Sequence, residues 1–116
     1  MFRFETLDVW RLAADFVSEV YLLTKLWPKS ELFSLTAQIW RSAVSIPANI
    51  AEGSAAATIK DNKNYLDYAR KSLFETASHL LIAEKQGYLK ERERHHLYEK
   101  ADMLSRKLVS FKRSLR

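Results

Sequence analysis

The chain has 116 residues, with 19 Lys and Arg against 14 Asp and Glu, and a net charge of +5 at pH 7. This length predicts a single domain, residues 1–116, whose core needs neither disulfides nor metal. The absence of cysteine excludes a disulfide framework and a thiolate zinc site. Two Gly and two Pro leave little material for hairpins, so an all-α fold is favoured. Because no apolar run has the length of a signal peptide or membrane span, we expect a cytoplasmic protein without membrane contact.

The basic charge is concentrated in the second half of the sequence. Residues 1–57 hold five Lys and Arg against six Asp and Glu, whereas residues 58–116 hold fourteen against eight. The last twelve residues, SRKLVSFKRSLR, contain five bases and no acid. Such asymmetry is typical of proteins that bind a polyanion.

The first two predicted helices follow from capping residues and a proline. Thr6 is a candidate N-cap for a helix that runs to about Lys25, and Pro28 disfavours its continuation. The second helix begins after Ser34 as N-cap. In the first helix, apolar side chains recur at helical spacing at Val9, Ala13, Phe16, Val20 and Leu23.

The third and fourth helices have the most regular apolar pattern. Thr58 and Asp61 have the spacing of a capping box, and Gly87 is expected to end the third helix at its C′ position. The apolar seam of the third helix is Leu66, Ala69, Leu73, Thr76, Leu80 and Ala83; that of the fourth is Leu97, Ala101, Leu104, Leu108, Phe111 and Leu115. Four amphipathic helices with short connections predict an antiparallel up-down four-helix bundle.

The second helix carries more apolar surface than one bundle core requires. One stripe is formed by Leu35, Ile39, Ala43, Ile46 and Ile50, and a second, next to it, by Trp40, Val44, Pro47 and Ala51. Either this helix packs against two neighbours in the same chain, or its second stripe faces another protomer. We favour a homo-oligomer with its interface at Trp40, Val44, Pro47 and Ala51, because monomers avoid exposing such a patch.

The segment SIPANIAEG, residues 45–53, interrupts the helical pattern with a proline. Pro47 either kinks a continuous second helix, which is the fold we favour, or follows Ser45 as the cap of a fresh segment. Asn49 and Glu52 share a helix face and are expected to bond each other or a neighbouring helix end. Together with Gly53, which lets another backbone approach, they predict a structural motif and not a catalytic one.

Three segments resemble one protein family over nearly the whole chain. LDVWRLA near the start, SLTAQIWRSAVSIPANIAEGS in the second helix and GYL after the third look like the 23S ribosomal RNA intervening-sequence family. The resemblance implies a small antiparallel bundle, commonly a homopentamer around a central channel, with no established enzymatic activity. The family often has a basic residue just before Arg41; Trp40 stands there instead and extends the apolar stripe.

The resemblance also extends to the accessory protein of diversity-generating retroelements, which has a similar fold. That protein is a basic pentamer that binds a reverse transcriptase and nucleic acid. Two hypotheses therefore follow for this chain. In the first, it is a ring-forming homo-oligomer whose basic surface binds RNA or an RNA-handling partner; in the second, it is an accessory subunit of a reverse transcriptase or a structural assembly protein without direct nucleic-acid contact.

Catalytic and metal-binding patterns are poorly represented in the sequence. Glu93 and His96 have one Glu-x-x-His spacing, but a di-iron bundle needs two such motifs and further glutamates. His96 is expected on the solvated surface, and Glu75 and His79 form an ordinary helix-face pair. No phosphate loop or nucleophile elbow is present. We expect a non-enzymatic protein with no metal, cofactor or small-molecule substrate.

Basic side chains on the last two helices are the candidate nucleic-acid ligands. On the third helix, four bases fall within about 100° of arc, whereas those on the fourth spread around most of its non-core circumference. The alternative is that these charges only keep the bundle soluble. The predicted nucleic-acid contacts, made to phosphates with little sequence readout, are Lys60, Lys63, Arg70, Lys71, Arg106, Lys107, Lys112, Arg113 and Arg116.

Overall fold

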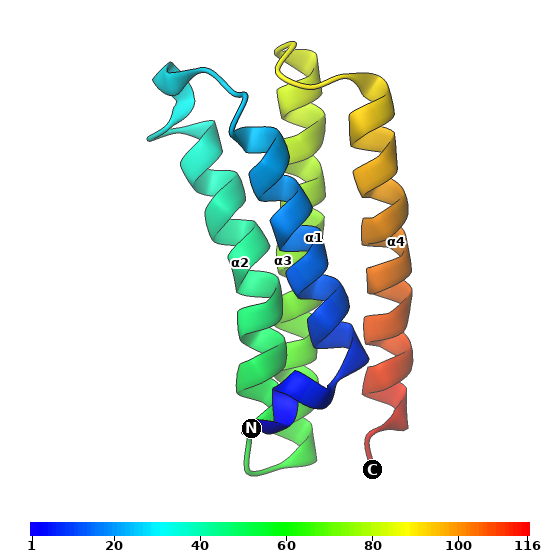
Figure 1. Cartoon of the computed structure of the whole chain (residues 1–116). Helices are drawn as coiled ribbons and strands as arrows, with labels where there is room; N and C mark the ends of the chain where they lie inside the picture. Colours follow the sequence, from blue (N-terminus) through cyan, green and yellow to red (C-terminus); the bar gives the residue numbers. More distant parts are fainter.

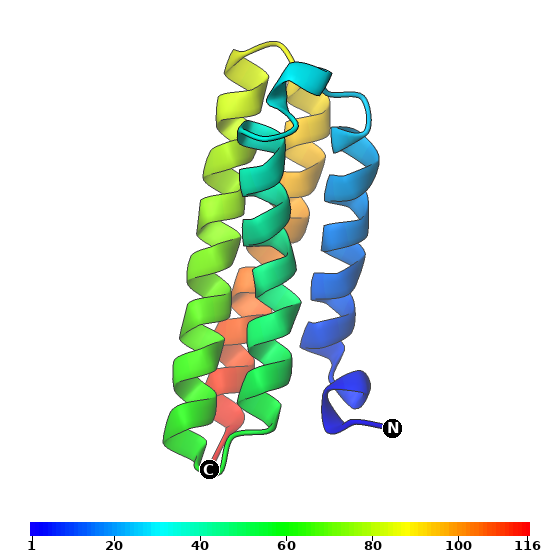
Figure 2. The same ribbon diagram turned by 90° about the vertical axis from the view of Figure 1, so that its left-hand side faces the viewer.

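The computed structural model describes all 116 residues, and it confirms the all-α prediction: four α-helices, two short 3-10 helices and no strand (Figure 1). The long helices are α1 Asp8–Thr24, α2 Leu35–Ser54, α3 Ile59–Lys85 and α4 Glu91–Ser114; the short ones are η1 Arg3–Thr6 and η2 Lys29–Glu31. Each long helix packs against the next, and α1 also contacts α4. Both chain ends and the α2–α3 turn lie at one end of the bundle (Figures 1 and 2).

The start of α1 differs from the prediction by one residue. Leu7, not Thr6, occupies the N-cap position, and Leu7 has no side chain that can cap. The Thr6 hydroxyl instead donates to the carbonyl of Arg3 at 2.8 Å, inside η1. This short helix is held by Glu5, whose carboxylate accepts a hydrogen bond from the Phe2 backbone N–H at 2.6 Å. The Thr6 hydroxyl is therefore used within η1 and does not cap α1, contrary to the prediction from the sequence.

The second helix runs through Pro47 without a break, from Leu35 to Ser54. Ser45 therefore does not cap a fresh segment, and its hydroxyl lies 2.9 Å from the Ser72 hydroxyl of α3. Ser34 is the N-cap residue as predicted, but it makes no side-chain capping bond. Glu31 of η2 replaces it, because its Oε1 accepts a hydrogen bond from the Leu35 N–H at 3.3 Å.

The predicted ends of α3 are confirmed. The Thr58 hydroxyl accepts a hydrogen bond from the Asp61 N–H at 3.1 Å, which satisfies one of the free donors at the helix start. Gly87 has a φ of +81°, a left-handed conformation that favours glycine, and the chain leaves the helix there. At the start of α4, the Glu93 carboxylate accepts from the Lys90 N–H at 2.8 Å.

One apolar core runs along the bundle axis and contains 19 buried residues from all four long helices and their connections. The predicted seam of α3 is buried throughout, and Thr76 is its one polar member. In α4, the first four predicted seam positions are buried, while Phe111 and Leu115 are half-buried at the end of the helix. None of the helices combines the length and apolar character that crossing a bilayer requires.

Candidate nucleic-acid interface

Side chains of α3 and α4 line a hollow at the end of the bundle that holds the chain termini. Its volume is about 300 Å³, and its apolar floor is Leu66, Leu108 and Val109. Helical spacing places the polar residues of α3 on one face, four and three residues apart, and the last turn of α4 supplies the others. Cations in that last turn are also favoured by the helix dipole. The charged residues that line the hollow are Lys63, Asp67, Arg70, Lys112 and Arg113.

Two of the four cations in this hollow are held by neighbouring side chains. Lys112 Nζ lies 2.9 and 3.0 Å from the two carboxylate oxygens of Asp67. Arg70 donates from Nε to the Ser105 hydroxyl at 3.0 Å. Lys63 and Arg113 form no ion pair. With four bases and one acid, the hollow carries a net charge of +3. The positive potential that results attracts phosphate groups.

The remaining predicted contacts are spread over other surfaces. Lys107 lies on the opposite side of α4, in a separate hollow beside the start of α1. Arg106 pairs with Asp102 at 3.2 Å, and Lys71 lies 5.8 Å from the ring centre of Tyr68. Lys60 and Arg116 are exposed near the ends of their helices. The structure therefore brings together Lys63, Arg70, Lys112 and Arg113 of the nine predicted residues, and the single-helix wheel could not separate them from Lys107.

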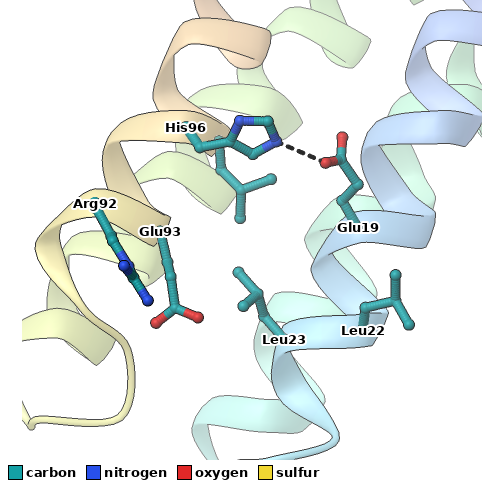
Figure 3. Close-up of a pocket in the computed structure, with 7 residues that line it drawn as sticks. Glu19, Leu22, Leu23, Arg92, Glu93 and His96 are labelled. Carbon is teal, nitrogen blue, oxygen red and sulfur yellow. Dashed lines mark hydrogen bonds and ion pairs between the residues drawn. The ribbon is translucent and has the colours of Figure 1, made fainter.

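A second hollow lies between α1 and α4 and is largely apolar, with a charged rim (Figure 3). His96, predicted to be a solvated side chain, is exposed, but its Nε2 lies 2.8 Å from Oε1 of Glu19. Lys100 Nζ lies 3.2 Å from the other oxygen of this carboxylate. Burial alone would raise the pKa of Glu19, but the hydrogen bonds from His96 and Lys100 outweigh it and hold the pKa below its ordinary value. This carboxylate therefore joins α1 to α4 in its ionised form.

Neither histidine motif forms a metal centre. The predicted helix-face pair is present, with His79 Nε2 3.2 Å from Glu75 Oε2. Glu93 points toward the hollow that His96 borders, but His96 is engaged with Glu19 (Figure 3). No group of three or more His, Cys, Asp or Glu side chains lies close enough together to hold a metal ion.

The second apolar stripe of α2 is covered unevenly within one chain. The Trp40 ring stacks on Tyr21 of α1 at a centroid distance of 5.3 Å, and its indole N–H donates to the Thr24 hydroxyl at 2.8 Å. Pro47 and Ala51 are half-buried. Val44 is 43% exposed. Within a single chain, α2 thus packs against two neighbours, α1 and α3, while Val44 stays partly exposed.

In the SIPANIAEG segment, the close approach expected at Gly53 is present, whereas Asn49 bonds a partner other than the predicted one. The Asn49 amide donates to the carbonyl and the hydroxyl of Ser45 at 2.8 and 2.9 Å, not to Glu52. Glu52 is exposed and forms no ion pair. Gly53 is buried, and a Cβ atom built there would lie 2.7 Å from Asn62 Oδ1 of α3. The glycine therefore permits the close approach of two helix backbones.

Four long helices around one apolar core, with hollows open at the surface, define a small all-α bundle protein. The chain belongs to the 23S rRNA-intervening sequence protein family, whose model matches residues 5–110. This match confirms the resemblance that the sequence segments indicated.

A crystal structure from Bacteroides thetaiotaomicron VPI-5482 has a similar fold. It is described as a protein with unknown function from the S23 ribosomal protein family, determined at 1.70 Å resolution. The TM-score is 0.82 and the sequence identity is 25%, over 91% of this chain and 99% of that one. No curated protein matches the chain.

Proposed function

We propose that this protein is a non-enzymatic, homo-oligomeric up-down four-helix bundle that binds RNA through the basic face of α3 and α4. The family resemblance favours a pentamer. The observation that carries the proposal is the convergence of Lys63, Arg70, Lys112 and Arg113 on one hollow. Membership in a family named after an rRNA insertion supports RNA as the polyanion, although a fold by itself does not determine function.

The expected binding mode is electrostatic. Lys63 and Arg113 have no acidic partner and are available to phosphates, whereas Lys112 would have to share its charge with Asp67. Contacts between cations and phosphates release counterions and carry no base information, so affinity should fall steeply with salt and depend little on sequence. Repetition of the hollow around an oligomer would strengthen binding through avidity.

Filter binding with rRNA fragments between about 50 and 200 mM salt tests this mode, because phosphate-dominated binding weakens by orders of magnitude over that range. The variant Lys63→Glu/Arg113→Glu should weaken binding at low salt and reduce the salt slope. The matched control is Lys25→Glu/Lys29→Glu, which makes the same charge change at the other end of the bundle. A flat salt response, or equal effects of the two variants, would contradict the proposal.

The homo-oligomer is tested by the solution mass from light scattering. We place the interface on the stripe of Trp40, Val44, Pro47 and Ala51, centred on Val44 because it is the most exposed member. Val44→Glu should dissociate the assembly while helicity is retained, since a charge would be buried between protomers. Gln38→Glu, on another face of α2, is the control. A wild-type mass for Val44→Glu would place the interface elsewhere.

A further inference from the structure

Two aromatic side chains on the outward surface of α3 are exposed, and each has a cation beside its ring. Tyr68 is 51% exposed and Phe74 is 58% exposed. Lys71 Nζ lies 5.8 Å from the centre of the Tyr68 ring, and the Arg70 guanidinium lies over the Phe74 ring at 4.9 Å. At that distance, a cation is attracted by the face of an aromatic ring.

Neighbouring contacts restrain the Tyr68 ring and the cation beside Phe74. Tyr65 packs against Tyr68 edge to face at a centroid distance of 6.0 Å and an interplanar angle of 84°. Beside Phe74, Arg70 is fixed by its hydrogen bond to Ser105 of α4. Rings that are already oriented lose little conformational freedom when a ligand stacks on them, which favours binding.

Phe74 adjoins the basic hollow, and Tyr68 lies farther from it on the outward face of α3. Arg70 lines the hollow and also covers Phe74. Tyr68 and Phe74 are six residues apart, which separates them by about 9 Å along the helix axis and about 120° around it. Lys71 lies midway between them, three residues from each ring. Rings and cations therefore alternate around the outward half of α3, in the order Tyr68, Lys71, Phe74 and Arg70. Aromatic side chains next to basic ones are the combination by which proteins hold single strands.

We propose that the RNA bound at this surface is single-stranded, with its bases stacked on Tyr68 and Phe74 and its phosphates on the neighbouring cations. The inference rests on the RNA binding proposed above and adds the strandedness of the ligand. A single strand can turn its bases toward aromatic side chains, whereas a duplex keeps its base faces stacked inside and offers phosphates and hydroxyls.

The test compares a short single-stranded uridine oligomer with an RNA duplex of equal length, by fluorescence anisotropy at one salt concentration. The variant Tyr68→Ala/Phe74→Ala should weaken single-strand binding roughly tenfold or more, because each stacked base is lost. Duplex binding should stay at the wild-type level. Tyr68→Phe/Phe74→Tyr keeps both rings and should bind the single strand like the wild type.

Phe33→Ala is the matched control, because Phe33 is an aromatic residue that is 93% exposed in the α1–α2 connection. It should leave binding of both RNAs unchanged. The thermal unfolding of each variant establishes that α3 is still folded. The solution mass of Tyr68→Ala/Phe74→Ala should equal that of the wild type; a lower mass would place the two rings in an interface between copies and overturn the proposal.

The remaining outcomes separate this inference from the proposed function. If the wild type binds both RNAs with a steep salt dependence and the double alanine variant binds the single strand equally well, stacking is overturned and phosphate binding stands. Equal weakening for single strand and duplex overturns stacking in the same way. If the wild type binds neither RNA at low salt, both proposals fail.

Discussion

The interface between α2 and α3 and the two interfaces of α4 are built on different principles. Small polar side chains line the α2–α3 interface, where the Ser42 and Thr76 hydroxyls lie 2.8 Å apart in a buried position. Long charged side chains span the interfaces of α4, as in the contact of Arg94 with Glu84 at 2.6 Å. Short side chains let backbones approach closely, whereas long ones bridge wider gaps.

Because of this difference, the α2–α3 interface contributes mainly to stability, whereas the side chains around α4 stay accessible to solvent. The α2–α3 interface excludes solvent from Ser42 and Thr76, so its hydrogen bonds are costly to break. At α4, the partners of the charged side chains are partly exposed, and hollows remain on both sides of the helix. Substitutions between α2 and α3 should therefore act on folding, whereas those at α4 should act mainly on ligands and charge.

The largest effect is expected at Gly53. Even a single Cβ atom there would lie 3.0 Å from the Tyr65 Cβ and 3.2 Å from the Asn62 carbonyl oxygen, a backbone atom that cannot turn away. Gly53→Val should lower the free energy of unfolding by about 1–3 kcal/mol, the usual cost of overpacking. Urea denaturation of the variant and the wild type measures this difference in the free energy of unfolding.

The control for this substitution is Ala48→Val in the same helix, at an exposed position. It tests helix propensity alone and should cost less than about 1 kcal/mol. If both variants lose the same stability, the close approach of α2 and α3 at Gly53 contributes nothing of its own.

The next effect concerns the buried hydroxyl pair. Thr76→Val removes the hydroxyl that contacts both Ser42 Oγ and the Ser72 carbonyl, at 2.8 and 2.9 Å. The variant should lower the free energy of unfolding by about 1–2 kcal/mol, because the buried Ser42 hydroxyl is left with fewer hydrogen-bond partners. Adding Ser42→Ala should cost little more, because the Ser42 hydroxyl has already lost Thr76 and keeps only its hydrogen bond to the Ile39 carbonyl at 3.2 Å. Additive losses in a double-mutant cycle by urea denaturation would show that the two hydroxyls are not coupled.

The sequence was sufficient to predict the four long helices, but not how each helix is rotated toward its neighbours. Apolar spacing placed the core positions of α3, and the Thr58 and Gly87 signals marked its ends, because these depend on local geometry. The partner of Trp40 depended on which residue of α1 would lie opposite it. Thr24, sixteen residues earlier, provides that partner, and no local signal identifies it.

The basic site shows the same limit. Lys107 and Lys112 are five residues apart, so a helix turns about 140° between them. The first faces the hollow beside α1 and the second the hollow beside α3. Their positive charge is evident from composition, but the neighbour that each one faces is set by the packing of the whole bundle.

A smaller effect is expected at the ion pair between Asp67 and Lys112. Their side chains are 45% and 38% exposed, so Asp67→Asn should lower the free energy of unfolding by less than about 1 kcal/mol. The same substitution releases Lys112 and removes the one acid from the hollow, so RNA affinity should rise. Asp15→Asn makes the same charge change at an exposed position of α1, away from the hollow, and is the control for filter binding. A fall in affinity for Asp67→Asn would place the RNA on another surface.

The smallest effect concerns the contact of α4 with α1 at Glu19, and it depends on pH. Since the pKa of Glu19 is held below its ordinary value by His96 and Lys100, folding favours the ionised carboxylate. The stabilisation is present at neutral pH and is lost as pH falls through the lowered pKa. Glu19→Gln should therefore be less stable than the wild type at neutral pH, by under about 1 kcal/mol because the pair is partly exposed to solvent. Below that pKa the two should converge. Glu99→Gln, at an exposed pair within α4, is the control and should change the stability at neutral pH by less than Glu19→Gln does. A constant difference between Glu19→Gln and the wild type at every pH would mean that packing, not charge, joins α1 to α4 here.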